Sequence, residues 1–166
     1  MAFMQGVVFC VLYAVKTNPN EKVIQHIGSA YSDLGIVCIG AGKEKDRCDR
    51  LTKDWKGPVL NLCGITQPRI SALAMQNALF YVGHDSGPMH LAALVDTPCI
   101  AIFSARSKPG VWFPRGEDNH VFYPWSTVHQ ASHRTGFRTA GNSIRCIKAE
   151  AVIEACEQML DRQTLP

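Results

Sequence analysis

Short apolar runs recur along the chain at regular intervals, and this recurrence limits the fold more than any other feature. The first run, VVFCVLYAV at residues 7–15, is rich in β-branched and aromatic residues and shows no alternation with polar ones. Such a continuous run is typical of a strand covered on both faces, as in a parallel sheet. The same reasoning predicts strands at residues 35–39, 58–62, 79–82 and 98–103, and a short sixth strand at residues 120–123.

Segments with helical spacing separate these runs. Residues 21–31 place Val23, Ile24, Ile27 and Ala30 on one face, which is the pattern of an amphipathic helix. Strands that alternate with helices predict βαβ units with right-handed crossovers. We therefore predict an α/β fold, an open doubly wound parallel sheet of Rossmann-like form, whose ligands bind beyond the carboxyl ends of the strands. Further helices are expected at residues 44–55, 67–78, 89–95 and 149–160, with loops at residues 105–117 and 126–142.

Size, charge and cysteine content narrow the class of protein. A chain of 166 residues with 46% hydrophobic and 19% charged residues suits one globular domain over residues 1–166. The net charge of +3 comes from scattered basic residues and does not favour nucleic-acid binding. Seven cysteines without a Cys-x-x-Cys pair predict free thiols and a cytoplasmic location. The apolar start lacks a basic segment and is too short to span a bilayer, so we expect no transmembrane segment.

The turn after the fourth predicted strand carries the strongest functional signal. It reads Gly-His-Asp-Ser-Gly-Pro-Met-His at residues 83–90 and leads into a helix. The first N–H groups of a helix are unpaired and carry partial positive charge, so they can bind a phosphate. Gly87 would let a bulky anion approach the backbone, Pro88 lacks a donor that would be unpaired in any case, and His90 could reach the same anion. The turn therefore predicts a site for the phosphates of a nucleotide-type ligand.

Two alternatives for this turn remain open from the residues alone. Asp85 and Ser86 are common helix caps and could serve only in that role. Ser86, His90 and Asp85 could instead form a hydrolase triad, but the turn lacks the Gly-x-Ser-x-Gly pattern of a nucleophile elbow. The separate acid that would orient the histidine is also missing, so the triad is the weaker hypothesis.

Residues 79–103, LFYVGHDSGPMHLAALVDTPCIAIF, resemble the signature of the heptosyltransferase family, glycosyltransferase family 9. The resemblance rests on Asp-Ser-Gly-x-x-His, then Leu-x-Ala-Ala, then Thr-Pro and a strand that ends in Phe. It extends over roughly residues 35–160, including Asn-Leu-Cys-Gly at 61–64 and Trp-Phe-Pro at 112–114. It implies the GT-B architecture of two Rossmann-like domains, of which this chain resembles the C-terminal, donor-binding one. The implied ligand is a nucleotide-diphosphate sugar, with no metal and no further cofactor.

The resemblance also implies roles for individual residues. Asp85, Ser86, Gly87 and His90 match the residues beside the donor diphosphate and sugar. Glu44 matches a glutamate that holds the nucleotide ribose, although it could instead be a solvated acid near a helix start.

Three further residues complete the implied donor site. Lys16 matches a lysine that would neutralise the leaving diphosphate, although it could instead be an exposed loop lysine without a role in binding. Cys63 and Gly64 would shape the nucleotide pocket or simply end a strand.

The sequence departs from the family pattern in two places. Residues 13–15 read Tyr-Ala-Val where the family has a turn rich in glycine, serine and threonine. The N-terminal acceptor domain, which the resemblance implies would carry the catalytic acid, is not found in this sequence. We therefore expect a heptosyltransferase-like donor domain for transfer to a lipopolysaccharide-type acceptor, with peripheral contact at the inner membrane face through that acceptor. The alternative is a non-catalytic nucleotide-sugar-binding module that needs a separate acceptor-domain chain.

Overall fold

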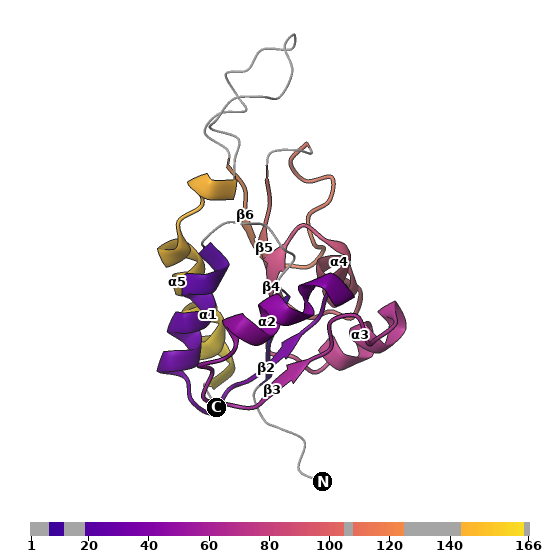
Figure 1. The fold of residues 1–166 in the computed structure, drawn as a ribbon. Coiled ribbons are helices and arrows are strands. Elements are labelled where there is room, and N and C mark those ends of the chain that lie inside the picture. The colour runs from indigo at the N-terminus through magenta and orange to yellow at the C-terminus, as the bar shows by residue number, and fades with distance from the viewer. Residues whose placement is uncertain (1–6, 12–18, 105–107, 125–143, 165–166) are drawn as a thin grey trace.

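The strands form one parallel sheet with the order β3-β2-β1-β4-β5-β6 (Figure 1). This computed structural model describes residues 7–11, 19–104, 108–124 and 144–164. All five strand pairings are parallel, which confirms the predicted open parallel sheet. The strands are β1 (Val7–Val11), β2 (Gly35–Cys38), β3 (Val59–Asn61), β4 (Phe80–His84), β5 (Cys99–Ile102) and β6 (His120–Phe122).

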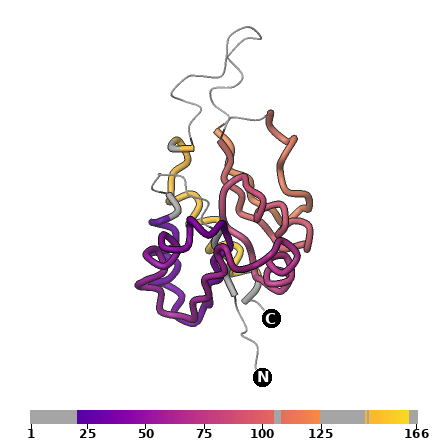
Figure 2. Tube along the Cα trace, turned by 45° about the vertical axis from the view of Figure 1, so that its right-hand side comes forward, coloured from indigo at the N-terminus to yellow at the C-terminus, as the bar shows by residue number. Residues whose placement is uncertain are grey.

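Helices cover both faces of the sheet, as a doubly wound fold requires (Figures 1 and 2). On one face, side chains of α1, α2 and α5 join a single apolar core with β2, β4 and β5. On the other face, α3 and α4 pack against the same strands. The helices are α1 (Pro19–Ala30), α2 (Lys45–Leu51), α3 (Pro68–Met75), α4 (Gly87–Leu94) and α5 (Ala149–Thr164), with 3-10 turns at Gly42–Glu44 and Ile144–Cys146.

The buried strand β4 shows why its sequence is a continuous apolar run. Phe80 and Val82 point into the core beneath α1 and α5, while Tyr81 points into the core beneath α3 and α4. Successive side chains of a strand face opposite sides, so a strand covered twice has no solvent face to fill with polar residues. Phe80 and Tyr81 are both fully buried, which is the physical basis of the sequence pattern.

The strand order places a topological switch point between β1 and β4. From β1 the chain moves outward through β2 to β3, and α3 then carries it back across the other face to β4 on the opposite side of β1. In open α/β sheets, ligands bind beyond the carboxyl ends of the strands at such a point. The residues that follow β4, Asp85 and Ser86, lie at this edge of the sheet.

Several predicted boundaries differ from the structure. The predicted strand at residues 79–82 extends to His84, and the helix predicted from residue 89 begins at Gly87. The helix predicted for residues 44–55 is a 3-10 turn followed by α2, which ends at Leu51. Beyond Leu51 the chain turns so that the ring of Trp55 enters the core, where its Nε1–H donates to the carbonyl of Leu34 (2.8 Å).

Parts of the first strand and the second loop lie outside the described residues. The strand predicted for residues 7–15 is described only as far as residue 11, and the loop predicted for 126–142 is not described. Within the described ranges, we find no helix with the length and apolar character that a membrane crossing demands.

Candidate functional site

The helix α4 starts immediately after the buried strand β4. The N–H of Asp85 donates to the carbonyl of Ile102 (3.2 Å) and so continues the pairing with β5 by one residue. Ser86 is the N-cap residue with extended backbone, and its carbonyl accepts the N–H groups of Met89 (3.0 Å) and His90 (3.3 Å). Only two residues therefore separate the strand from the helix, and the helix N-terminus is fixed at the carboxyl edge of the sheet.

The side chain of Ser86 does not cap the helix that it precedes. It makes no side-chain capping hydrogen bond, and its Oγ is buried with no partner in the described part of the chain. The capping hypothesis for Ser86 is therefore not what the structure shows. The Ser–His hydrogen bond of a hydrolase triad is also not formed, because the Oγ of Ser86 does not pair with His90. A buried hydroxyl without a partner is costly, which makes Ser86 a candidate for contact with a bound group.

Backbone donors are open at the start of α4. Neither Ser86 nor Gly87 has a recorded acceptor for its N–H among the residues that the structure covers, and Pro88 has no N–H. Gly87 is exposed, and a Cβ built on it would meet no described atom within 4 Å. Two unpaired N–H groups at the positive end of a helix dipole form a site that favours an anion.

Two ionisable side chains and one aromatic ring surround this helix N-terminus. The Nε2 of His90 lies 3.8 Å from Oδ1 of Asp85, and both side chains are partly exposed. The rings of His90 and Trp112 meet edge to face with centroids 6.0 Å apart. Asp85, Ser86, Gly87 and His90, all predicted from sequence, thus lie together, and Trp112 joins them from the connection between β5 and β6.

Glu44 lies at the end of the 3-10 turn that follows β2, and its side chain is buried. Only 1% of the residue is exposed, so it is not a solvated acid. Its Oε2 accepts the N–H of Ala41 (2.7 Å), which ties the carboxylate to its own loop. The predicted contact of Glu44 with a ribose stays a prediction, since this conformation turns the carboxylate inward.

Gly64 and Cys63 close the ends of β2 and β3 against each other. The N–H of Gly64 donates to the carbonyl of Gly40 (2.8 Å), and Gly64 has a φ of +75°. A Cβ on Gly64 would lie 2.4 Å from the Cα of Gly42, so the two loops pass too closely for any other residue. Gly64 therefore shapes the same edge of the sheet that carries Glu44.

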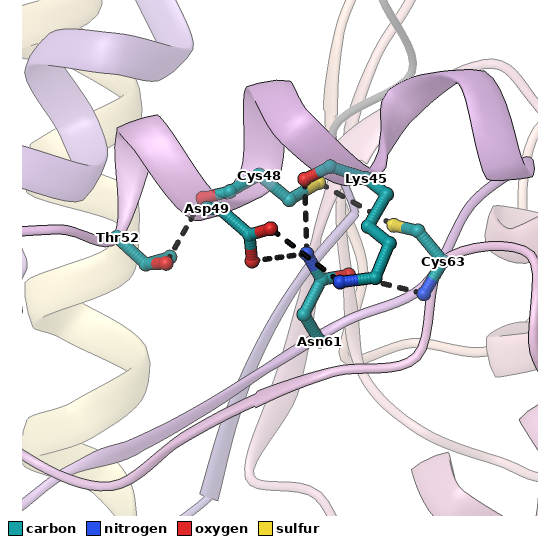
Figure 3. A network of polar contacts seen from close by, with 6 residues as sticks. All are labelled: Lys45, Cys48, Asp49, Thr52, Asn61 and Cys63. Atoms are coloured by element: carbon teal, nitrogen blue, oxygen red, sulfur yellow. Dashed lines mark hydrogen bonds and ion pairs between the residues drawn. The ribbon is translucent and has the colours of Figure 1, made fainter.

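A polar network joins α2 to the end of β3, and sequence reasoning missed it (Figure 3). The Nδ2 of Asn61 donates to the carbonyl of Lys45 (3.0 Å) and to Oδ1 of Asp49 (2.7 Å), while its Oδ1 accepts the N–H of Cys63 (3.1 Å). The hydrogen bond from Asn61 lowers the pKa of Asp49, helped by the nearby Lys45. An asparagine at the end of a strand was the only sequence signal for this network.

His84 is a second residue that sequence reasoning missed. It ends β4, one residue before the predicted site, and only 3% of it is exposed. Burial lowers its pKa to about 4, and the charge of Arg47 on α2 acts in the same direction. His84 is therefore neutral at physiological pH.

Lys16 lies outside the described residues, so the structure does not place it. Within the described ranges, no three His, Cys, Asp or Glu side chains are grouped in a way that could hold a metal ion. The remaining predicted residues form two groups at the carboxyl edge of the sheet. One group, at the start of α4, presents unpaired N–H groups at a helix N-terminus, and the other, at the ends of β2 and β3, shapes the adjoining loops.

Comparisons with solved structures support the same architecture. The chain matches a glycosyltransferase of family 9 from Veillonella parvula with a TM-score of 0.72 at 16% identity, covering 95% of this chain and 46% of that one. It matches the ADP-heptose lipopolysaccharide heptosyltransferase II of Escherichia coli with a TM-score of 0.71 at 16% identity, covering 99% and 49%. The chain therefore has the Rossmann-like fold of about half of a GT-B glycosyltransferase.

Sequence comparisons identify the family. A curated relative, lipopolysaccharide heptosyltransferase 3 of Escherichia coli K12, is 32% identical over 147 residues, which are 84% of this chain and 40% of the relative. A second Escherichia coli protein of the same name is 33% identical over 113 residues, 64% of this chain and 29% of the relative. The chain thus spans well under half the length of these relatives. Because the model of glycosyltransferase family 9 (heptosyltransferase) matches residues 13–142, the chain belongs to that family.

Proposed function

We propose that this chain is the donor-binding part of a heptosyltransferase-like glycosyltransferase and binds a nucleotide-diphosphate sugar. The reaction would transfer a heptose or a similar sugar to a lipopolysaccharide-type acceptor. Family membership supports sugar transfer, and the curated relatives are named as lipopolysaccharide heptosyltransferases. Two solved relatives of similar fold contain ADP or an ADP-linked fluoro-heptose, which suggests an adenine nucleotide as the first ligand to test.

The observation that carries the proposal is the open N-terminus of α4. The described part of the fold does not need a glycine at position 87, because a Cβ there would meet open space. The glycine is explained if a bulky anion approaches the N–H groups of Ser86 and Gly87. These donors lie at the switch point of the sheet, where this class of fold binds its ligands.

The surrounding groups suit a leaving diphosphate. Bond cleavage between sugar and phosphate builds negative charge on the diphosphate, and fixed N–H dipoles stabilise that charge without rearrangement. His90 is near enough to contact the same oxygens, and Asp85 at 3.8 Å would orient its ring. The buried hydroxyl of Ser86 would gain a partner in the bound ligand.

The other predicted residues would line the remaining parts of the donor site. Lys16 would add a positive charge to the diphosphate site. Cys63 and Gly64 would form the floor of the nucleotide pocket, because they fix the ends of β2 and β3. Glu44 would hold the ribose, and this contact requires its 3-10 turn to open, since the carboxylate is buried against Ala41.

The proposal is tested by calorimetry with ADP and with ADP-heptose. We expect micromolar to millimolar binding. We expect His90→Ala to weaken it at least about fivefold, because it loses a contact worth about 1 kcal/mol. Asp85→Ala should weaken binding similarly because the His90 ring loses the group that orients it, and Gly87→Ala because the added Cβ obstructs the approach of the anion. Leu94→Ala is the matched control, since Leu94 lies at the far end of α4 and is 76% exposed. Unchanged affinity in all three site variants would overturn the site assignment.

A second function is a binding module without transferase activity. It is favoured by one observation, that the groups assigned at the start of α4 in the described ranges would contact the donor and not the acceptor. A separate acceptor-domain chain would then complete the enzyme. Transfer assays with the purified chain alone, and then with cell extract added, distinguish the two functions, because turnover by the purified chain excludes the module.

A further inference from the structure

Trp112 presents an aromatic surface beside the proposed diphosphate site. It is 54% exposed, and among the large hydrophobic side chains exposed in the described ranges it is the only aromatic one. Its indole lies 6.0 Å from the ring of His90, with 68° between the ring planes. The two rings are therefore not stacked, and the contact with His90 leaves indole surface open to a further flat group.

The backbone that carries Trp112 is firmly anchored. The next residue, Phe113, packs its ring against Phe103 (4.8 Å) and Tyr123 (5.7 Å), and both of these rings belong to the core on the α4 side. Pro114 is buried as well. The indole thus projects from a fixed base, and ordering it in a complex would cost little entropy.

Its position relative to His90 suggests what the indole binds. His90 borders the N–H groups that would hold the diphosphate, and the indole of Trp112 contacts His90, so the indole is within reach of the group next to the diphosphate in the ligand. In a nucleotide-diphosphate sugar one end of the diphosphate carries the ribose and the other end carries the transferred sugar. Glu44, the proposed ribose residue, follows β2, and the strands β1 and β4 separate β2 from the β5–β6 connection, so Trp112 lies on the side of the transferred sugar. The C–H face of a sugar ring is flat and weakly apolar, and it packs well on a large aromatic surface.

We propose that Trp112 packs against the transferred sugar of the donor and so distinguishes a nucleotide-diphosphate sugar from the free nucleoside diphosphate. This inference rests on the proposed function and assigns a sugar-specificity role to the connection between β5 and β6. Trp112 is a contact residue for the donor, separate from the groups that hold the diphosphate.

The experiment measures the Kd of ADP and of ADP-heptose for the wild-type chain and for Trp112→Ala, Trp112→Phe and Leu94→Ala. An aromatic contact of this kind changes affinity about fivefold to tenfold. We expect Trp112→Ala to weaken the binding of ADP-heptose by about that factor and the binding of ADP by less than about twofold. Trp112→Phe should retain most of the affinity for ADP-heptose. Leu94→Ala should change neither.

Tryptophan fluorescence supplies a readout that a structural role would not move. ADP-heptose should change the emission of the wild-type chain more than ADP does, and Trp112→Phe should remove this difference while it still binds both ligands. Equal losses for ADP and ADP-heptose in Trp112→Ala, or no loss for either, would overturn the role of Trp112. The site variants Gly87→Ala and Asp85→Ala test the proposed function separately, because they should weaken both ligands.

Discussion

The Sγ atoms of Cys48 and Cys63 lie 3.4 Å apart, although the two residues are on α2 and on the loop after β3 (Figure 3). Both thiols are fully buried. The pKa of Cys48 rises to about 12, chiefly through its hydrogen bond with Cys38, and the pKa of Cys63 is raised by its hydrogen bond with Cys48 and by burial. The pair therefore remains neutral and packs as part of the core beneath the proposed nucleotide pocket.

The first prediction concerns the reactivity of these thiols. The thiolate is the reactive form, so a buried thiol with a raised pKa should react slowly. We expect iodoacetamide at pH 8 to modify the exposed Cys146 at least about a hundredfold faster than Cys48 or Cys63, as measured by mass spectrometry of labelled peptides. Urea-unfolded protein is the control, in which the three rates should converge. Fast labelling of Cys63 in the folded chain would contradict the buried pair.

The same thiols predict a loss of stability at high pH. The unfolded chain ionises its cysteines near pH 9, whereas the folded chain holds Cys48 neutral until about pH 12. A raised folded-state pKa gives a stabilisation that is complete below pH 9 and is lost as pH rises from 9 towards 12. Urea denaturation from pH 8 to 11 should show a falling free energy of unfolding. A Cys48→Ala variant should show a shallower fall, and an unchanged slope would exclude this thiol as a cause.

The third prediction is that His84 contributes to a loss of stability at low pH. Its pKa is about 4 in the folded chain against an ordinary value of 6.5, because burial and the charge of Arg47 disfavour the protonated ring. The stabilisation is present above pH 6.5 and is lost as pH falls through 4, where the unfolded chain binds a proton first. We expect about 3 kcal/mol of stability to be lost across this window. His84→Asn should remove most of that pH dependence in denaturation curves, and a parallel curve for the variant would refute the assignment.

Substitutions of Gly64 and Gly110 test how close packing of the backbone affects the free energy of unfolding. Both have positive φ, but a Cβ on Gly64 would lie 2.4 Å from the Cα of Gly42, whereas no described atom lies within 4 Å of one on Gly110. Gly110→Ala should therefore cost about 1 kcal/mol from backbone conformation alone. Gly64→Ala should cost about 3 kcal/mol or more, because the loops must also separate. Thermal denaturation measures both, and equal losses would show that the two loops are not in contact.

Glu44 is tested by a pair of substitutions. Glu44→Ala should lower the free energy of unfolding by about 2 kcal/mol, since the N–H of Ala41 loses its acceptor and a buried space opens. Glu44→Gln keeps an acceptor oxygen, and we expect near wild-type stability. If the carboxylate also holds the ribose, Glu44→Gln should still weaken ADP binding about fivefold. Wild-type affinity in that stable variant would restrict Glu44 to its role within the loop.

The open parallel sheet with helices on both faces could be predicted from the sequence, because the patterns that indicate it are local. Each continuous apolar run, such as residues 79–82, fixes a strand buried on both faces, and each run of helical spacing fixes a covering helix. The helix start between Asp85 and His90 could also be predicted from the sequence, since its residue types and its place after a buried strand indicate an exposed helix N-terminus. These features depend on neighbours within a few residues.

Other features depend on contacts between residues that are distant in sequence, and these appear only in the folded chain. The carboxylate of Glu44 faces inward towards Ala41, and Cys48 packs against Cys63. The helix α2 ends at Leu51, and Trp112 lies beside His90. Each outcome depends on how close two elements pack, and packing distance leaves no periodic signal in the sequence. The strand order that puts the β4–α4 turn at the switch point is likewise a property of the assembled sheet. Local hydrophobic pattern thus set the elements, and close packing between them set the site.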